Sequence, residues 1–513
     1  MNNLNFPFRL IIKHVVLVFC SLVSTLVCAQ NSKFWVYLKD KRDDIGQIYV
    51  SPKTLENRRL LGLELLQYTD MPVTSEYIKQ LKQHAIMACQ SKWLNAVSML
   101  GTSEDIAQIM KIPFVDRVEF IRTPLMYAGK DAPPRIDDYA ITQINGRVFK
   151  KRHLSGSGIS IGIIDGGFLG ADVNPELQQF FKKKKVKAVR DFVDDSRKDF
   201  YKGDEAAVGH HGANVCMLMV GKTMGIARNS ELYLARTEDQ KNESAVEEDY
   251  WIEALEWMDS LGVRVVNSSL GYSLDFDNQS ENHKPEDMDG KTCPISKAAQ
   301  IGAEQKGMTI VVSAGNEGRN KLWGTVTAPA DARAVISVGA TDKLFLKRDV
   351  SSFGPPGLPY LKPDLACYSM GGTSFSAPII TAMIACIIQK KPSLKNTEIA
   401  EILKKASNLY PFGNNFIGYG VPDAEKVLQL LSGYDSPSLS ETVNASGSVF
   451  NLKTGDKAIV FHKNDKECVV NQEIISGENG LLTIKRLGDS SRTTLLLSNR
   501  TIEILWNGQA TEN

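Results

Sequence analysis

Five short apolar runs, spaced along the middle of the chain, constrain its fold more than any other feature. They are ISIGIID, ELYLART, VRVVNSSLG, MTIVVSAGN and AVISVGA. Nearly all-apolar runs of this length are typical of strands that are buried on both faces of a sheet. Helical stretches lie between them, notably AVEEDYWIEALEWMDSLG, whose apolar residues recur at intervals of three and four. Strands that alternate with helices predict an α/β domain with a mostly parallel, doubly wound sheet over residues 139–433.

Polar residues follow three of these apolar runs. Asp165 closes ISIGIID, the segment SSLG follows VRVVN, and Asn316 ends MTIVVSAGN. In a sheet of this type, reactive residues gather beyond the carboxyl ends of the strands. The sequence therefore predicts that these three segments lie at one edge of the sheet.

The first 29 residues have the pattern of a secretory signal peptide. Arg9 and Lys13 precede an apolar run over residues 15–27, which is short for a membrane anchor. We expect cleavage after Ala29; lipidation of Cys28 is the alternative, but the residues before it do not suit a lipobox. The mature chain is then expected to be secreted, to the periplasm or the extracellular space, with no membrane span.

Two further domains are expected on either side of the sheet domain. Residues 30–125 combine strand-like runs such as KFWVYL and FVDRVEF with the helical run SPKTLENRRLLG, which predicts an α+β domain. Within it, Thr102 and Asp105 form a capping box at the start of a helix. Proline and glycine in residues 126–138 indicate a linker, and short strand-like runs over residues 434–513 predict a small all-β domain.

Composition narrows the range of partners. The formal net charge is +1, and no basic stretch is interleaved with aromatic residues, so we expect no nucleic-acid partner. Removal of the signal peptide leaves six cysteines, too sparse for a disulfide framework. Cys216 and Cys386 lie in apolar runs and are predicted to be core residues. We expect a monomer.

The run GGTSFSAP places Ser374 just before the apolar stretch IITAMIACII. A serine at a helix N-terminus lies beside unpaired backbone N–H groups, which favour the oxyanion of an acyl-transfer intermediate. The alternative is a serine or threonine cap on a core helix. A membrane-spanning helix is disfavoured by the length of the run and by Pro378.

A serine nucleophile needs a base, most often a histidine. The run GHHGANV offers His211, which stands before a glycine at the start of an apolar helical run, and His210 beside it. We favour His211. The pair could instead bind a metal ion, but adjacent residues on a helix face different ways.

Asp165 and Asn316 complete the candidate set. A buried aspartate needs a partner, and an imidazole held in one orientation would supply it; a helix cap or a calcium ligand is the alternative. The Asn316 amide could donate a hydrogen bond to a developing oxyanion, although AGNEG would serve equally well as a turn that ends a strand.

Asp165, His211, Asn316 and Ser374 occur in this order, each in its own local sequence, and the arrangement resembles the subtilisin-like serine peptidases. The family's serine signature stands here as GTSFSAP, and its His-Gly signature lies within GHHGANV. The resemblance covers about residues 139–425. The stretches RTED and NSSLGY are similar to exported members from the Bacteroidota. SKWLNAVS and PFVDRVEF resemble the inhibitory propeptides of that group.

That resemblance implies a secreted serine endopeptidase with a subtilisin-like fold, made as a zymogen. Ser374 would be the nucleophile and His211 the general base. Asp165 would orient the imidazole, and Asn316 would form the oxyanion hole with the Ser374 backbone N–H. The implied substrate-binding residues are Ser269, Leu270, Gly271, Ser313, Ala314 and Gly315. The first three would be an exposed edge that pairs with substrate as an added strand. The implied partners are protein or peptide substrates and the chain's own propeptide.

The sequence departs from the family pattern near the predicted site. Gly166 stands where Ser or Thr is usual, Ala213 where Thr is usual, and Cys216 where Ala is usual. No departure removes a reacting group. We expect no cofactor and no catalytic metal; Asp287 and Asp289 could bind a structural calcium ion, but the sequence does not place such a site.

Three classes of function are consistent with these features. An active endopeptidase accounts for all four segments. A peptide-binding pseudoenzyme is the second class, favoured by Gly166 and Ala213. An esterase or a metal-dependent enzyme is the third, which the SSLG segment and the propeptide-like domain disfavour.

Overall fold

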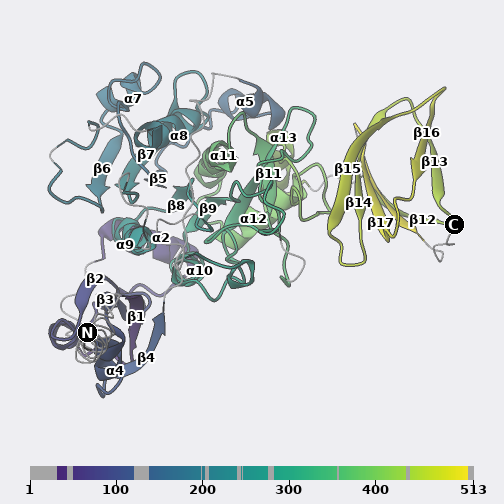
Figure 1. Cartoon of the computed structure of the whole chain (residues 1–513). Helices are drawn as coiled ribbons and strands as arrows, with labels where there is room; N and C mark the ends of the chain where they lie inside the picture. The colour runs from purple at the N-terminus through teal and green to yellow at the C-terminus, as the bar shows by residue number, and fades with distance from the viewer. Residues whose placement is uncertain are drawn as a thin grey trace, which may run out of the picture.

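The computed structural model describes four β-sheets: one in the N-terminal region, one in the middle of the chain and two in the C-terminal region (Figure 1). The residues it describes are 32–42, 50–120, 138–197, 199–202, 207–239, 244, 246–274, 282–354, 358–434, 439–498 and 500–506. The predicted signal peptide, and the predicted linker except Asp138, lie outside these ranges. The predicted domain boundaries therefore stay predictions.

The middle sheet has seven strands in the described residues, in the order β11-β10-β9-β8-β5-β7-β6. The strands are β5 (Ser160–Asp165), β6 (Val186–Asp191), β7 (Glu231–Arg236), β8 (Val265–Ser268), β9 (Thr309–Ser313), β10 (Ile336–Thr341) and β11 (Leu365–Tyr368). Every neighbouring pair is parallel. The predicted α/β class is confirmed, and the sheet is parallel throughout.

Helices cover both faces of this sheet, which explains its apolar strands. Along β5, Ile161 and Ile163 pack in one core with α8 and α11, whereas Ile164 packs in a second core with α9 and α10. Side chains alternate between the faces of a strand, so a sheet covered on both sides needs apolar residues at every position.

The described helices of this domain are α5 (Tyr139–Gln143), α6 (Arg147–Lys151), α7 (Gln178–Lys182), η3 (Ala207–His210), α8 (His211–Val220), α9 (Val246–Ser260), η5 (Pro285–Asp287), α10 (Pro294–Glu304), η6 (Thr373–Phe375), α11 (Ala377–Lys390), α12 (Asn396–Lys405) and α13 (Ala424–Leu431). Residues 373–390 are long and apolar enough to span a membrane, but 89% of that segment is buried inside the protein. The segment is the core helix of the sheet domain.

The N-terminal sheet is antiparallel, in the order β2-β3-β1-β4. Its elements are β1 (Ser32–Leu38), α2 (Pro52–Leu61), η2 (Tyr68–Asp70), α3 (Ser75–Leu81), β2 (Ile86–Ser91), β3 (Ala96–Gly101), α4 (Ser103–Ile109) and β4 (Val115–Phe120). The predicted capping box is present, because the Thr102 hydroxyl accepts from the Asp105 N–H and the Asp105 carboxylate accepts from the Thr102 N–H.

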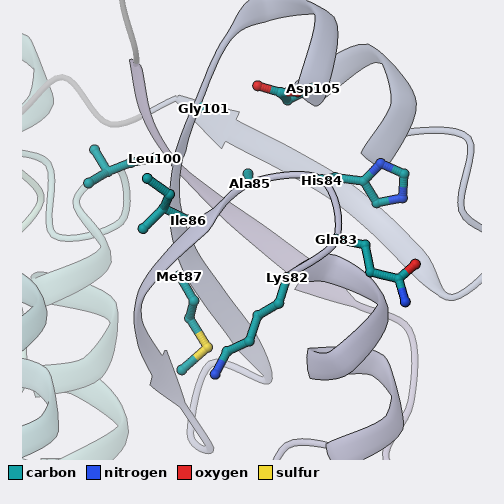
Figure 2. A pocket seen from close by; sticks show the side chains of 9 residues that line it. All are labelled: Lys82, Gln83, His84, Ala85, Ile86, Met87, Leu100, Gly101 and Asp105. Atoms are coloured by element: carbon teal, nitrogen blue, oxygen red, sulfur yellow. The ribbon is translucent and has the colours of Figure 1, made fainter.

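An open hollow lies on this domain between the end of α3 and the start of α4 (Figure 2). His84, Ile86 and the capping residue Asp105 line it, and Ile86 is 65% exposed. Gly101 also lines this hollow. A side chain there would be crowded, because an added Cβ would lie 3.0 Å from the Cβ of Ala85.

The C-terminal region is all-β, as predicted. Its strands are β12 (Ser440–Ala445), β13 (Val449–Lys453), β14 (Lys457–Lys463), β15 (Val469–Ser476), β16 (Leu481–Lys485), β17 (Arg492–Leu496) and β18 (Thr501–Trp506). In the described residues they form a five-stranded sheet and a two-stranded sheet, which share a core. Phe461, Val469 and Leu496 of this region pack against Leu409 and Ile417 of the sheet domain.

The N-terminal domain packs on α9 and α10 of the sheet domain (Figure 1). Trp35, Tyr37 and Trp93 lie in the same apolar cluster as α9 and α10. Helix α2 also contacts the end of α9, where the Thr54 hydroxyl donates to the carbonyl of Asp259 at 2.8 Å. This interface therefore joins the two domains through shared core residues.

Candidate active site

The carboxyl ends of three neighbouring strands bring the predicted residues to one edge of the sheet. Asp165 is the last residue of β5, Ser269 follows β8, and Ser313 ends β9 three residues before Asn316. These strands are adjacent in the order β9-β8-β5. The shared edge follows from parallel strands, whose carboxyl ends all point the same way.

Asp165 and His211 form a buried pair. The Nδ1 of His211 lies 2.7 Å from Oδ1 of Asp165, and the side chains are 4% and 0% exposed. The Gly166 backbone N–H donates to the same Oδ1 at 2.8 Å. An imidazole held in this way keeps one tautomer, with a proton on Nδ1 and Nε2 as the basic nitrogen.

Glycines allow β5 and α8 to approach closely enough for this pair. The Gly212 N–H donates to the carbonyl of Gly167 at 2.8 Å. A Cβ at Gly212 would lie 2.6 Å from that carbonyl oxygen and 3.0 Å from the Cβ of Asp165. The glycine after His211 is therefore required by close packing.

His210 points elsewhere. It is exposed, and its Nδ1 lies 3.0 Å from the carbonyl oxygen of Leu169. The structure places His211, and not His210, beside Asp165.

Ser374 lies in the short 3-10 helix η6, immediately before α11. The predicted place of Ser374, just before an apolar helix, agrees with this position, since α11 begins at Ala377. The Ser374 hydroxyl donates to the Ser269 carbonyl at 3.0 Å, and the Ser269 hydroxyl donates to the Ser374 carbonyl at 2.8 Å. The ring of the next residue, Phe375, lies 5.3 Å from the His211 ring, centroid to centroid. The serine segment is therefore hydrogen-bonded to Ser269, the residue that follows β8, and lies next to His211.

The Asn316 amide is fixed against the serine segment. Its Oδ1 accepts hydrogen bonds from the N–H and the hydroxyl of Thr373, at 2.9 and 3.1 Å. Because the oxygen is occupied in this way, the Nδ2 group is the one left to donate. A Cβ on Gly372 would lie 2.5 Å from that Nδ2, so the glycine gives the amide room two residues before Ser374.

The six predicted substrate-binding residues flank this site but are more buried than expected. Ser269 and Leu270 are 0% and 1% exposed, so their side chains do not form the exposed edge that was predicted. Leu270 belongs to the core on the α9 side, and Gly271 leads into Tyr272, which pairs with Ala328.

Ser313, Ala314 and Gly315 are also buried. The Gly315 N–H donates to the Thr373 hydroxyl at 3.1 Å, and the Ala314 carbonyl accepts from the Thr327 N–H. Gly315 has a φ of 106°, which requires glycine. The segment thereby holds Asn316 in place.

The departures from the family pattern leave this geometry intact. Gly166 supplies a backbone donor to Asp165, and Ala213 is buried in the core beside α11. Cys216 is buried, as predicted, and burial together with the nearby Asp165 raises the pKa of its thiol well above the usual range. The thiol therefore stays neutral beside the aspartate.

Thr373 is the residue that the sequence did not single out. Its backbone N–H holds the Asn316 amide, and its hydroxyl proton is shared between Asn316 Oδ1 and the Gly315 carbonyl, each 3.1 Å away. The sequence signal that could have pointed to Thr373 was its position inside the serine signature GTSFSAP.

The two acidic residues considered for calcium accept hydrogen bonds from nearby backbone groups. Asp289 accepts from the N–H groups of Lys291 and Thr292, and Asp287 accepts from the N–H of Lys284.

Comparison with known proteins shows the class to which this fold and site belong. A model of the subtilase family, peptidase S8, matches residues 156–420, and one of the peptidase S8 propeptide domain of the Bacteroidota matches residues 33–135. The chain belongs to the subtilase family and is a serine-type endopeptidase with a propeptide domain.

Several known proteins are similar to large parts of this chain. Subtilisin NAT from Bacillus subtilis subsp. natto is 23% identical over 350 residues, which cover 66% of this chain and 82% of that protein. Subtilisin DY from Bacillus licheniformis is 26% identical over 307 residues, which cover 57% of this chain and 98% of that protein. The solved structure of the epidermin leader peptide processing serine protease from Staphylococcus aureus has a TM-score of 0.55 at 16% identity, and covers 80% of this chain and 100% of that one. The subtilisin-like fold is confirmed.

Proposed function

We propose that Ser374 attacks the scissile carbonyl of a peptide while Nε2 of His211 takes the proton from its hydroxyl. The attack forms a bond from Oγ to the carbonyl carbon, and His211 then returns the proton to the leaving amine as the peptide bond breaks. Water, activated by the same imidazole, releases the acyl group. The observation that carries the proposal is the buried pair of His211 and Asp165, 2.7 Å apart, beside the serine segment.

The proposal is tested by two histidine variants compared in a peptide hydrolysis assay. His211→Ala should lower kcat by about 10⁶, the loss found when the catalytic histidine of subtilisin is removed. His210→Ala should stay within about twofold of the wild type, as expected for an exposed side chain away from the chemistry. If the two variants lost activity equally, or if only His210→Ala did, the assignment would be wrong.

Asn316 is proposed to stabilise the oxyanion together with the backbone N–H of Ser374. Asn316→Ala should reduce kcat by about 10² to 10³ with little change in KM, because the hydrogen bond is made in the transition state. Asn320→Ala is the matched control, since the Asn320 side chain accepts a hydrogen bond from the Leu322 N–H at 3.1 Å, away from the serine segment. A rise in KM at unchanged kcat would instead assign Asn316 to substrate binding.

Peptide or protein substrates are proposed to pair with the backbone of Ser269 to Gly271. The support is positional: the Ser269 carbonyl lies 3.0 Å from the Ser374 hydroxyl, so a strand paired there would present its scissile bond to that serine. Ser313 to Gly315 would form the opposite wall.

Secretion and inhibition by the propeptide complete the proposal. The support for secretion is the signal-peptide pattern of residues 1–29 together with a propeptide domain of a type found in Bacteroidota peptidases. Docking of the propeptide domain on α9 and α10 supports its role as the chain's own partner.

A further inference from the structure

Helix α9 carries four acidic side chains along the face that the propeptide domain covers. Asp249, Glu253, Glu256 and Asp259 follow one another at intervals of four, three and three residues. These intervals place them in one row on a helix. Asp249, Glu256 and Asp259 are buried, and Glu253 is partly buried. We call these four residues the acidic row.

The two ends of the acidic row are paired with cations of the propeptide domain. Lys33 Nζ lies 2.8 Å from the Asp249 carboxylate, and Arg58 Nη2 lies 3.1 Å from that of Asp259. Lys306 of the sheet domain also lies 4.0 Å from Asp259. These carboxylates are compensated where they are buried.

The middle of the acidic row has neutral partners. Glu256 accepts from the Ser91 hydroxyl at 2.6 Å and from the N–H groups of Trp93 and Lys92 at 3.1 and 3.3 Å. In the described ranges, neither Glu253 nor Glu256 forms an ion pair with a lysine or arginine. Neutral donors satisfy the oxygens but do not cancel a buried charge.

Glu253 borders a cavity between the two domains. The cavity measures about 320 Å³, and its lining includes Val73 and Gln90 of the propeptide domain and Arg190 of β6. The pKa of Glu253 is raised from its ordinary 4.5 to about 7. Burial is the largest cause and the nearby carboxylates of Asp249 and Glu256 add to it, whereas Gln90 and Arg190 oppose the shift.

The other carboxylates of the row shift in the same direction. Burial raises the pKa of Glu256, against Lys92 and the Ser91 hydroxyl, which lower it. Burial also raises the pKa of Asp249, although the nearby Lys33 lowers it. It also raises the pKa of Asp259, although Lys306 and Arg58 lower it and Asp70 raises it.

We propose that the acidic row makes propeptide docking depend on protons, so that the propeptide domain is held tightly at acid pH and more weakly as the pH rises through neutrality. The carboxylates of the acidic row have raised pKa values in the docked state and return to ordinary pKa values when undocking exposes them. The docked state therefore binds more protons than the undocked state. Groups with a raised pKa in the docked state stabilise it fully below their ordinary value and lose that effect as the pH rises through the raised value. For Glu253 that window runs from 4.5 to about 7.

Basic groups nearby do not offset this dependence in the same window. Burial lowers the pKa of Lys41, which lies near Glu256, to about 8, and the pKa of Lys306 is also lowered by burial. A lysine with a pKa of about 8 is fully charged between pH 5 and 7, so it contributes no slope there. Release of the propeptide on a rise in pH would then precede activity, a consequence that rests on the proposed peptidase function.

Amide hydrogen exchange of the full chain carrying Ser374→Ala tests this proposal without any measurement of hydrolysis. Protection of the β2–β3 hairpin, corrected for the chemical exchange rate, should fall at least tenfold between pH 5 and pH 7, since one pKa unit corresponds to a tenfold change in the docking constant. In a chain that also carries Glu253→Gln and Glu256→Gln, the fall should be much smaller, because only Asp249 and Asp259 of the acidic row still titrate. Glutamine is close in shape to protonated glutamate and keeps the role of hydrogen-bond acceptor.

Glu304→Gln is the matched control, because Glu304 is exposed on the neighbouring helix α10. It should keep the full pH dependence. Glu253→Gln alone should also reduce the pH dependence, which provides a second test if the double variant folds poorly. Constant protection between pH 5 and pH 7 in the parent chain, or an unchanged tenfold fall in the glutamine variants, would overturn the proposal. A failure of the peptidase assignment would leave this result unaffected.

Discussion

Replacing Ser374 with alanine is expected to abolish peptide hydrolysis and to leave the propeptide uncleaved. Removal of the Oγ nucleophile should lower kcat by about 10⁶, the magnitude found for the corresponding loss in subtilisin itself. If cleavage between the propeptide domain and the sheet domain is autocatalytic, the Ser374→Ala chain should accumulate in its uncleaved form. Electrophoresis of the purified protein measures the processing, and turnover of a peptide substrate measures the activity.

Ser376→Ala is the matched control for this variant. Ser376 lies two residues further on and is buried, and its hydroxyl makes no capping bond to α11. Its loss should therefore leave both processing and turnover close to those of the wild type. Normal processing of the Ser374→Ala chain would show instead that another protease cleaves it.

Replacing Arg58 with alanine is expected to loosen the propeptide domain from the sheet domain. The Arg58 guanidinium donates to both Asp70 oxygens at 2.6 and 2.9 Å and lies 3.1 Å from Asp259, and Lys306 lies 2.6 Å from Asp70. All four side chains are at most 5% exposed. Removing one partner of such a buried cluster costs about 3–5 kcal/mol, because the remaining charges are left without compensation.

Denaturant titration of the Ser374→Ala chain measures this effect. Trp35 and Trp93 are buried at the interface, so their fluorescence should report undocking at a lower urea concentration when Arg58→Ala is added. Arg59→Ala is the control, since Arg59 is the exposed neighbour on the same helix. Lys306→Met should weaken docking from the other side, with effects that do not add to those of Arg58→Ala. Equal effects of Arg58→Ala and Arg59→Ala would contradict this account.

Much of the fold could be predicted because the apolar runs leave few alternatives. The strands β5, β8 and β9 are apolar at almost every position, which occurs where helices cover both faces of a sheet. By contrast, β6 lies at the edge of the sheet and carries the polar residues Lys187 and Arg190. Because of these residues its sequence does not show the apolar pattern from which the other strands were predicted. Short edge strands of this kind have no clear periodicity.

The site could be predicted as a set of residues but not as a set of contacts. Asp165 and His211 are 46 positions apart, and only the sheet edge and the start of α8 bring them together. The role of Thr373 in holding Asn316 depends on a turn whose geometry the sequence does not specify. The acidic row of α9 could not be recognised as buried, because a charged helix face usually lies in solvent and its covering domain is distant in the sequence.

Labelling with a fluorophosphonate tests the central claim most directly. This reagent reacts with an activated serine hydroxyl and forms a stable covalent adduct in place of the acyl-enzyme. The processed, folded protein should be labelled at one site, which peptide mapping should assign to Ser374, and the His211→Ala variant should react far more slowly. Absence of labelling in the processed, folded protein, or labelling of a different serine, would contradict the assignment of Ser374 as the nucleophile.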